Sequence, residues 1–116
     1  MRAKKPLQNY EVTGKVNYND GIVKGIVVLA VSEVQGVLLK NGKKEKDKLD
    51  FIEVDFNGNN VTVKVTVDVI FGFNVPDVAF DVQESVKRNV EAMSRYKVSS
   101  VNVHVDSVVF QDGANV

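Results

Sequence analysis

The sequence has no Cys among its 116 residues. It therefore can form no disulfide, cannot use a thiol as a nucleophile, and cannot hold zinc through Cys ligands. It has a single His, His104, which falls between Val103 and Val105 on the polar side of an alternating segment. No other metal ligand stands at a recognisable spacing from it, so we expect a surface histidine and no metal site.

Long hydrophobic runs and an excess of one charge are also missing. The longest apolar stretch, residues 26–31, is far too short to span a bilayer. The basic start, residues 1–6, is not followed by the apolar segment of a signal peptide. Fifteen basic and fifteen acidic residues give a net charge of zero, so no overall field attracts nucleic acid or an anionic membrane. We expect a cytoplasmic protein.

Catalytic patterns are equally scarce. The glycines around Ile22 and Lys24 lack both the spacing and the Gly-Lys-Ser/Thr ending of a phosphate-binding loop. Four carboxylates alternate outward on predicted strands and could converge on an open sheet face, but no pocket-forming segment accompanies them; they are Glu53, Asp55, Asp68 and Asp106. The sequence therefore predicts no enzyme, no catalytic residue, no cofactor and no small-molecule substrate.

What is present is one domain with enough apolar residues for a core. A length of 116 residues and a hydrophobic share of 44% are typical of a single globular domain. We expect a disordered basic tail over residues 1–9, a domain over residues 10–110 and a frayed tail over residues 111–116. Because Val is abundant, propensity alone would predict strand nearly everywhere, and the spacing of apolar residues has to decide.

Alternation predicts strands over residues 10–18, 51–56, 61–69 and 98–110, with a hairpin turn at residues 57–60. Helical spacing predicts one helix over residues 22–34, with Ile22 buried and Val28 exposed, and a second over residues 75–95. The second helix has Pro76 in its first turn and a single apolar stripe that ends at Met93. Residues 38–49, rich in Lys, are predicted to be a solvated loop.

This order, β-α-β-β-α-β, predicts an α+β fold. We expect a two-layer sandwich in which two helices cover one face of a four-stranded, mainly antiparallel sheet. Three apolar residues lie off the predicted core and are candidate partner contacts; they are Val28, Phe73 and Phe80.

A four-stranded sheet backed by two helices is also typical of RNA-recognition domains. Those domains stack bases on outward aromatic residues, which the predicted strands here do not supply. A nucleic-acid-binding module is therefore the alternative function, and we consider nucleic acid a poor partner. It would depend on weak anion contacts in the Lys-rich loop 40–48, made by Lys40, Lys43, Lys44, Lys46 and Lys48.

Three segments form a recognisable series along the chain: residues 33–37 read E-V-Q-G-V, residues 72–79 read G-F-N-V-P-D-V-A, and residues 101–105 read V-N-V-H-V. In their order and spacing they resemble the alkaline-shock (general-stress) protein family of Gram-positive bacteria. The resemblance covers roughly residues 10–110 and departs from the family at Ser94-Arg95-Tyr96, where Thr-Gly-Leu is common, and in the Lys-rich loop.

The resemblance implies a non-enzymatic, cytoplasmic, stress-related interaction or scaffold protein linked to cell-envelope homeostasis. It implies a protein partner or self-association, and contact with the membrane only indirectly through a partner. The family has no established catalytic residues, so none is carried over to this chain.

Overall fold

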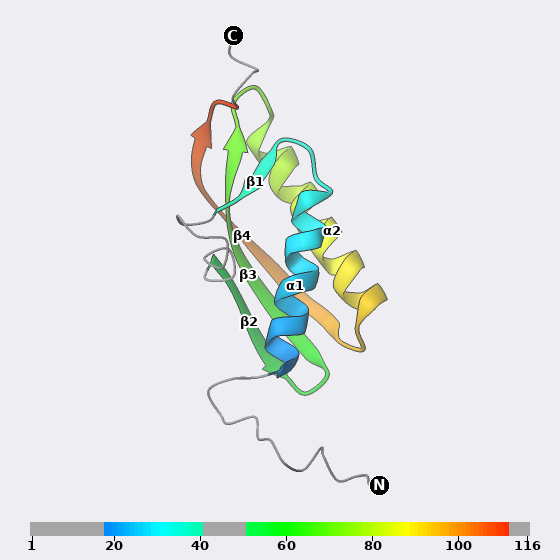
Figure 1. Cartoon of the computed structure of the whole chain (residues 1–116). Coiled ribbons are helices and arrows are strands. Elements are labelled where there is room, and N and C mark those ends of the chain that lie inside the picture. The colour runs from blue at the N-terminus through cyan, green and yellow to red at the C-terminus, as the bar shows by residue number, and fades with distance from the viewer. Residues whose placement is uncertain (1–17, 41–50, 112–116) are drawn as a thin grey trace, which may run out of the picture.

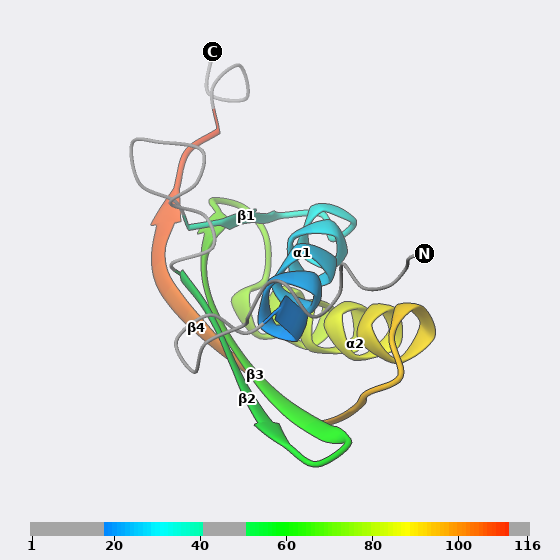
Figure 2. The ribbon, with the colours of Figure 1, turned by 60° about the horizontal axis from the view of Figure 1, so that its bottom comes forward.

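The computed structural model describes residues 18–40 and 51–111. These residues form two helices, α1 (Tyr18–Ser32) and α2 (Val75–Met93), and four strands, β1 (Val37–Leu39), β2 (Ile52–Asn57), β3 (Asn60–Ile70) and β4 (Lys97–Val109). Both helices lie on the same side of a curved sheet (Figures 1 and 2). The predicted α+β class and two-layer architecture are confirmed.

The sheet is organised around β3. Strand β4 pairs with β3 in parallel along its whole length, from Asn60 to Ile70. The other edge of β3 is shared by two antiparallel strands, with β2 along residues 60–65 and β1 along residues 67–69. Two of the three pairings are therefore antiparallel, as the prediction of a mainly antiparallel sheet requires.

The predicted first strand, residues 10–18, lies outside the described residues except for Tyr18, which begins α1. The predicted tail over residues 1–9 also lies outside them, as does the predicted tail over residues 111–116 apart from Gln111. The prediction of a loop from residue 38 was wrong at its start, because Leu38 and Leu39 belong to β1. Gly36, with a φ of 88°, turns the chain after α1, and the Ile70 amide donates to its carbonyl over 2.8 Å. This turn positions β1 against the end of β3.

Strand β3 supplies the middle of the core, as its alternation predicts. Its odd-numbered valines, from Val61 to Val69, are all buried. The two helices lie over one face of the sheet that contains this strand (Figure 2). On β2 the same face carries Ile52, which is buried, and Val54 and Phe56, which pack against the core. Gly58, with a φ of 63°, makes the turn between the two strands.

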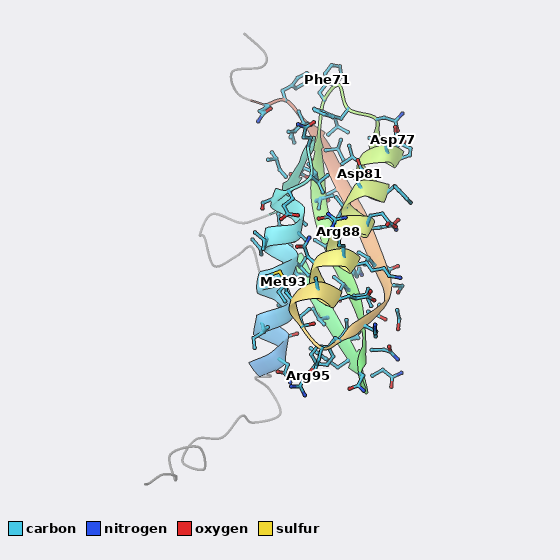
Figure 3. All side chains as sticks on the ribbon, turned by 90° about the vertical axis from the view of Figure 1, so that its right-hand side faces the viewer. Phe71, Asp77, Asp81, Arg88, Met93 and Arg95 are labelled. Atoms are coloured by element: carbon cyan, nitrogen blue, oxygen red, sulfur yellow. The ribbon has the colours of Figure 1, made fainter. Side chains whose placement is uncertain are left out.

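Helix α2 begins and ends with side-chain caps. The side chain of Asn74 accepts a hydrogen bond from the Asp77 amide over 3.0 Å, and Pro76 occupies the first turn. At the other end the Ser94 hydroxyl donates to the Val90 carbonyl over 2.7 Å. The buried stripe runs through Val78, Val82, Ser85, Val86 and Val90. The prediction that Met93 continues this stripe was wrong, because Met93 lies in the last turn and is exposed (Figure 3).

Helix α1 buries Val23, Ile26, Val27 and Ala30, as its helical spacing predicts, but the margins of its buried face differ from the prediction. Ile22, expected in the core, is exposed, while Val31 is buried. Val28, expected to be exposed, is half-buried and packs against the core. The reason is β1: it folds back beside α1, and Val28 lines a hollow together with Val31 and Val37. The two helices are tied by the buried Ser85 hydroxyl, which donates to the Ala30 carbonyl over 2.8 Å.

Candidate interaction surfaces

The open face of the sheet, opposite the helices, is polar. Register places Glu53 beside Lys64 and Asp55 beside Thr62, and all of these side chains alternate with the buried row. The four predicted outward carboxylates do not converge at one point. Only Asp68 and Asp106 come together, where β1, β3 and β4 meet.

Lys40 joins these two carboxylates. Its Nζ lies 3.0 Å from Asp106 Oδ2 and 3.5 Å from Asp68 Oδ2, and the Ser107 hydroxyl donates to Asp68 Oδ1 over 2.8 Å. The hydrogen bond to Asp106 and the charge of Asp68 raise the pKa of Lys40 above its ordinary value of 10.5. The ammonium is therefore charged at physiological pH and holds the end of β1 to β3 and to the bulge of β4.

This pairing makes Lys40 a poor anion contact, because two carboxylates already neutralise its charge. The other four lysines of the proposed anion site, Lys43, Lys44, Lys46 and Lys48, lie outside the described residues. The nucleic-acid alternative therefore stays a prediction for these four lysines.

His104 is exposed on the open face, as predicted. It sits opposite Thr66 in the β3–β4 register and borders a hollow of about 220 Å³ lined by Phe51, Glu53, Lys64 and Thr66. Within residues 18–40 and 51–111 no three His, Cys, Asp or Glu side chains are grouped so that they could hold a metal ion. The hollow therefore offers one imidazole, one carboxylate and one ammonium on an open surface.

The three predicted partner contacts occupy different surroundings. Phe80 is 58% exposed on the outer side of α2. Phe73 is also exposed, but it lies against the turn after α1: a Cβ on Gly36 would stand 2.6 Å from the ring. Val28 is half-buried and packs against the core. The structure thus leaves Phe80 as the clearest exposed residue of the three.

Sequence analysis missed an exposed aromatic pair at the end of the sheet. Phe71 follows β3 and Phe110 follows β4, and their rings lie 4.8 Å apart between centroids. They are 63% and 66% exposed, and we call them the aromatic tip. Figure 3 shows Phe71 at the end of the molecule opposite Arg95. Because β3 and β4 run parallel and Ile70 pairs with Val109, the next residue of each strand lies beside the other. The sequence did not predict this parallel pairing, so it did not predict the aromatic pair.

Solved structures share the fold at low sequence identity. A variant of the MamM CTD aligns with a TM-score of 0.51 at 16% identity, covering 78% of this chain and 98% of that one. Another variant, in a zinc form, has a TM-score of 0.51 at 17% identity and covers 84% and 91%. No described helix is long and apolar enough to cross a membrane.

Several proteins match this chain at higher sequence identity than these solved structures do. The Streptococcus pyogenes protein Spy1535 is 27% identical over 107 residues, which cover 85% of this chain and 82% of that one. Bacillus subtilis YqhY is 27% identical over 110 residues, covering 87% and 82%. A stress response regulator gls24 homologue of S. pyogenes is 29% identical over 104 residues, covering 81% of this chain but 58% of the homologue.

The resemblance to the alkaline-shock and general-stress proteins is confirmed by these relatives. The model of the alkaline shock protein 23 family, which is described as having a cell envelope-related function, matches residues 8–110. That match includes both helices and all four described strands. The chain belongs to the alkaline shock protein 23 family.

Proposed function

We propose that this chain is a non-enzymatic, cytoplasmic interaction or scaffold domain that serves cell-envelope homeostasis. The observation that carries the proposal is the set of aromatic side chains left on the surface of a small, well-packed domain. Phe71, Phe73, Phe80 and Phe110 are all exposed. Exposed aromatic residues are typical of protein contacts, because each can bury a large apolar area at small entropic cost.

The polar face supports the same proposal. Its strongest cluster, Lys40 with Asp68 and Asp106, is internally paired and fastens three strands to one another. Groups that neutralise each other in this way stabilise the sheet and are poorly placed to exchange protons with a substrate. The chemistry available on the described surface is therefore that of recognition.

We propose that any link to the membrane runs through a protein partner. The domain has a net charge of zero, which gives it no electrostatic attraction to anionic lipid. The family description connects it with the cell envelope, and a partner that reaches the membrane would reconcile the two.

Phe80 is the residue we assign to the partner contact. Phe80 follows Asp77 by three residues in α2 and comes directly before Asp81. Figure 3 shows Asp77 on the outer side of that helix. An aromatic ring flanked by carboxylates fits a partner surface that offers an apolar pocket with basic residues at its rim.

The test is affinity capture of the tagged chain from cells that express it naturally. Captured proteins are identified by mass spectrometry for the wild type, for Phe80→Ser and for Met93→Ser. Met93 is an exposed apolar residue at the other end of the same helix, so its variant controls for the loss of apolar surface. We expect one partner to be lost with Phe80→Ser and retained with Met93→Ser. If no protein is specifically enriched with the wild type, and the chain is monomeric at every concentration, the interaction function is wrong.

A further inference from the structure

The exposed side of α2 separates its charges by sign along the helix. The first half carries carboxylates and the second half carries cations, which continue just past the end of the helix. In chain order they are Asp77, Asp81 and Glu84, then Lys87, Arg88 and Arg95, and all six side chains are exposed. Figure 3 shows Asp77 and Asp81 toward one end of α2, and Arg88 and Arg95 toward the other. The one carboxylate of the second half, Glu91, accepts the Val98 amide through Oε2 and so is turned toward β4.

The stability of the isolated helix does not explain this separation. The helix macrodipole favours acidic residues in the first turn and basic residues in the last, but its influence fades within one turn. It accounts for Asp77, whereas the last turn of α2 holds no basic residue. Glu84 stands four residues before Arg88, the spacing of a favourable pair, yet Arg88 Nη2 lies 4.0 Å from Glu33 Oε1 instead. Within residues 18–40 and 51–111 neither Asp81 nor Glu84 forms an ion pair, so the acidic half has no counter-charge there.

We propose that the exposed side of α2 is a self-association surface, on which the α2 helices of two copies pack antiparallel about a two-fold axis near Ser85. This inference rests on the proposed interaction function and names a partner for the surface that bears Phe80. The antiparallel arrangement places the acidic half of each copy on the basic half of the other, and the axis repeats every contact. Residues whose numbers sum to about 170 then lie at the same level, because each residue advances the helix by about 1.5 Å.

The residues that meet in this arrangement are oppositely charged. Asp81 of one copy faces Arg88 of the other, and Glu84 faces Lys87, each pair within about 1.5 Å of the same level. Helical spacing puts Asp81 and Arg88 on one flank of the exposed side, and Phe80 and Lys87 on the other. Two facing helices related by such an axis bring like flanks together. The Phe80 ring of one copy therefore lies over the Lys87 side chain of the other, which offers an apolar stem and a cation–π contact.

Charge complementarity favours a second copy over an unrelated protein. An unrelated partner would have to present both signs of charge in the reverse order and at the same spacing along one surface. The α2 helix of a second copy does this whenever it runs antiparallel, because its own sequence sets the spacing. The net charge of zero adds no long-range repulsion between two copies. Phe80, which is 58% exposed, gives each copy an apolar group beside the ion pairs.

The size of this surface makes the association weak and reversible. One side of the 19-residue helix offers about ten residues, against roughly 20–30 per partner in a stable interface. Contacts of this smaller class are transient, so we expect a dissociation constant on the order of 10⁻⁴ M. Exposed ion pairs are screened by salt, and the dimer should therefore weaken as the ionic strength rises.

The test reverses the charge of each half of α2 in the full chain and measures association by sedimentation equilibrium at low salt. The all-acidic variant Lys87→Glu/Arg88→Glu and the all-basic variant Asp81→Lys/Glu84→Lys should each raise the dissociation constant about tenfold or more. An equimolar mixture of the two should associate again, because every pair across the contact is then oppositely charged. A chain with all four substitutions is self-complementary once more and should dimerise like the wild type. Lys64→Glu, on the open face of the sheet, is the control and should change nothing.

A single introduced thiol reports the geometry, because the chain has no Cys of its own. Glu84→Cys places the two sulfurs close to the axis, whereas Ala92→Cys separates them by about 21 Å along the helices. Oxidation should link two copies through the first variant and leave the second unlinked, and the reverse result would overturn the antiparallel contact.

The proposal is also overturned by a wild type that is monomeric up to about 1 mM, well above the expected dissociation constant. A mixture of the all-acidic and all-basic variants that associates no better than either alone has the same consequence, because misfolding cannot mimic a rescue by mixing. In either case a different protein captured by the wild type and lost with Phe80→Ser would leave the proposed function standing.

Discussion

Helices α1 and α2 cover the same face of one sheet, yet they are built differently. Helix α2 is polar on one side, carries a narrow buried stripe, and is closed by Asn74 and Ser94. Helix α1 is apolar nearly all round, contains Gly25, and leaves Ile22 and Leu29 exposed two turns apart on one side. The difference indicates that α2 is specified by local sequence, whereas α1 is held in place by what packs around it.

The largest effect should come from the stripe of α2. Val86 is fully buried, so Val86→Asp would place an unpaired charge in the core. We expect it to lower the free energy of unfolding by about 4 kcal/mol or more. Denaturant titration followed by circular dichroism measures this loss. Lys87→Asp, at the neighbouring exposed position, is the control and should change stability by about 0.5 kcal/mol or less.

The turn that ends α1 should be the next most sensitive. Gly36 has a φ of 88°, and a Cβ there would stand 2.6 Å from the Phe73 ring. Gly36→Ala should therefore destabilise the fold by about 1–3 kcal/mol, through backbone strain and a displaced ring. The thermal midpoint is the measurement. Gly36→Ala combined with Phe73→Ala should recover part of the loss, and a double variant no more stable than the single one would show that the ring is not involved.

The N-cap of α2 tests whether this helix is locally specified. Asn74→Ala removes the side-chain acceptor of the Asp77 amide and should cost about 1 kcal/mol. Asn74→Ser keeps a capping oxygen and should lose much less. Chemical denaturation of the three proteins checks this. Equal losses for Ala and Ser would mean that the cap contributes little and that packing determines where α2 begins.

The sequence predicted α2, β3 and the β2–β3 hairpin because each has an unambiguous period and turn chemistry. Val61 to Val69 alternate strictly with polar residues, and Asn74 with Pro76 is a typical helix start before a clear apolar stripe. The margins of the buried face of α1, at Ile22, Val28 and Val31, were not predictable from its own residues, because apolar side chains lie on nearly all sides of this helix. What decides them is β1, three residues long, which falls below the length at which a strand can be recognised.

The interaction surfaces were predicted less well, because most of them depend on contacts between segments that are distant in sequence. Phe80 was found, because it stands alone on the polar side of a clear helix. Phe71 and Phe110 were not, since they become neighbours only through the parallel pairing of β3 with β4. Lys40, Asp68 and Asp106 likewise meet only after three strands have been brought together. Pairing of strands distant in sequence is set by the whole fold, and no local pattern encodes it.

The smallest effect concerns the exposed side of α1, and it should be a gain. Gly25 lies mid-helix, and a Cβ there would meet nothing within 4 Å. Gly25→Ala should raise stability by about 0.4–1 kcal/mol, since Ala loses less backbone entropy on folding. Ala92→Gly, at an exposed position near the end of α2, should lose a comparable amount. Thermal unfolding of both variants measures the pair. If Gly25→Ala stabilises the monomer but weakens capture of a partner, the side of α1 that bears Ile22 and Leu29 is itself a contact surface, and the glycine is there to permit close approach.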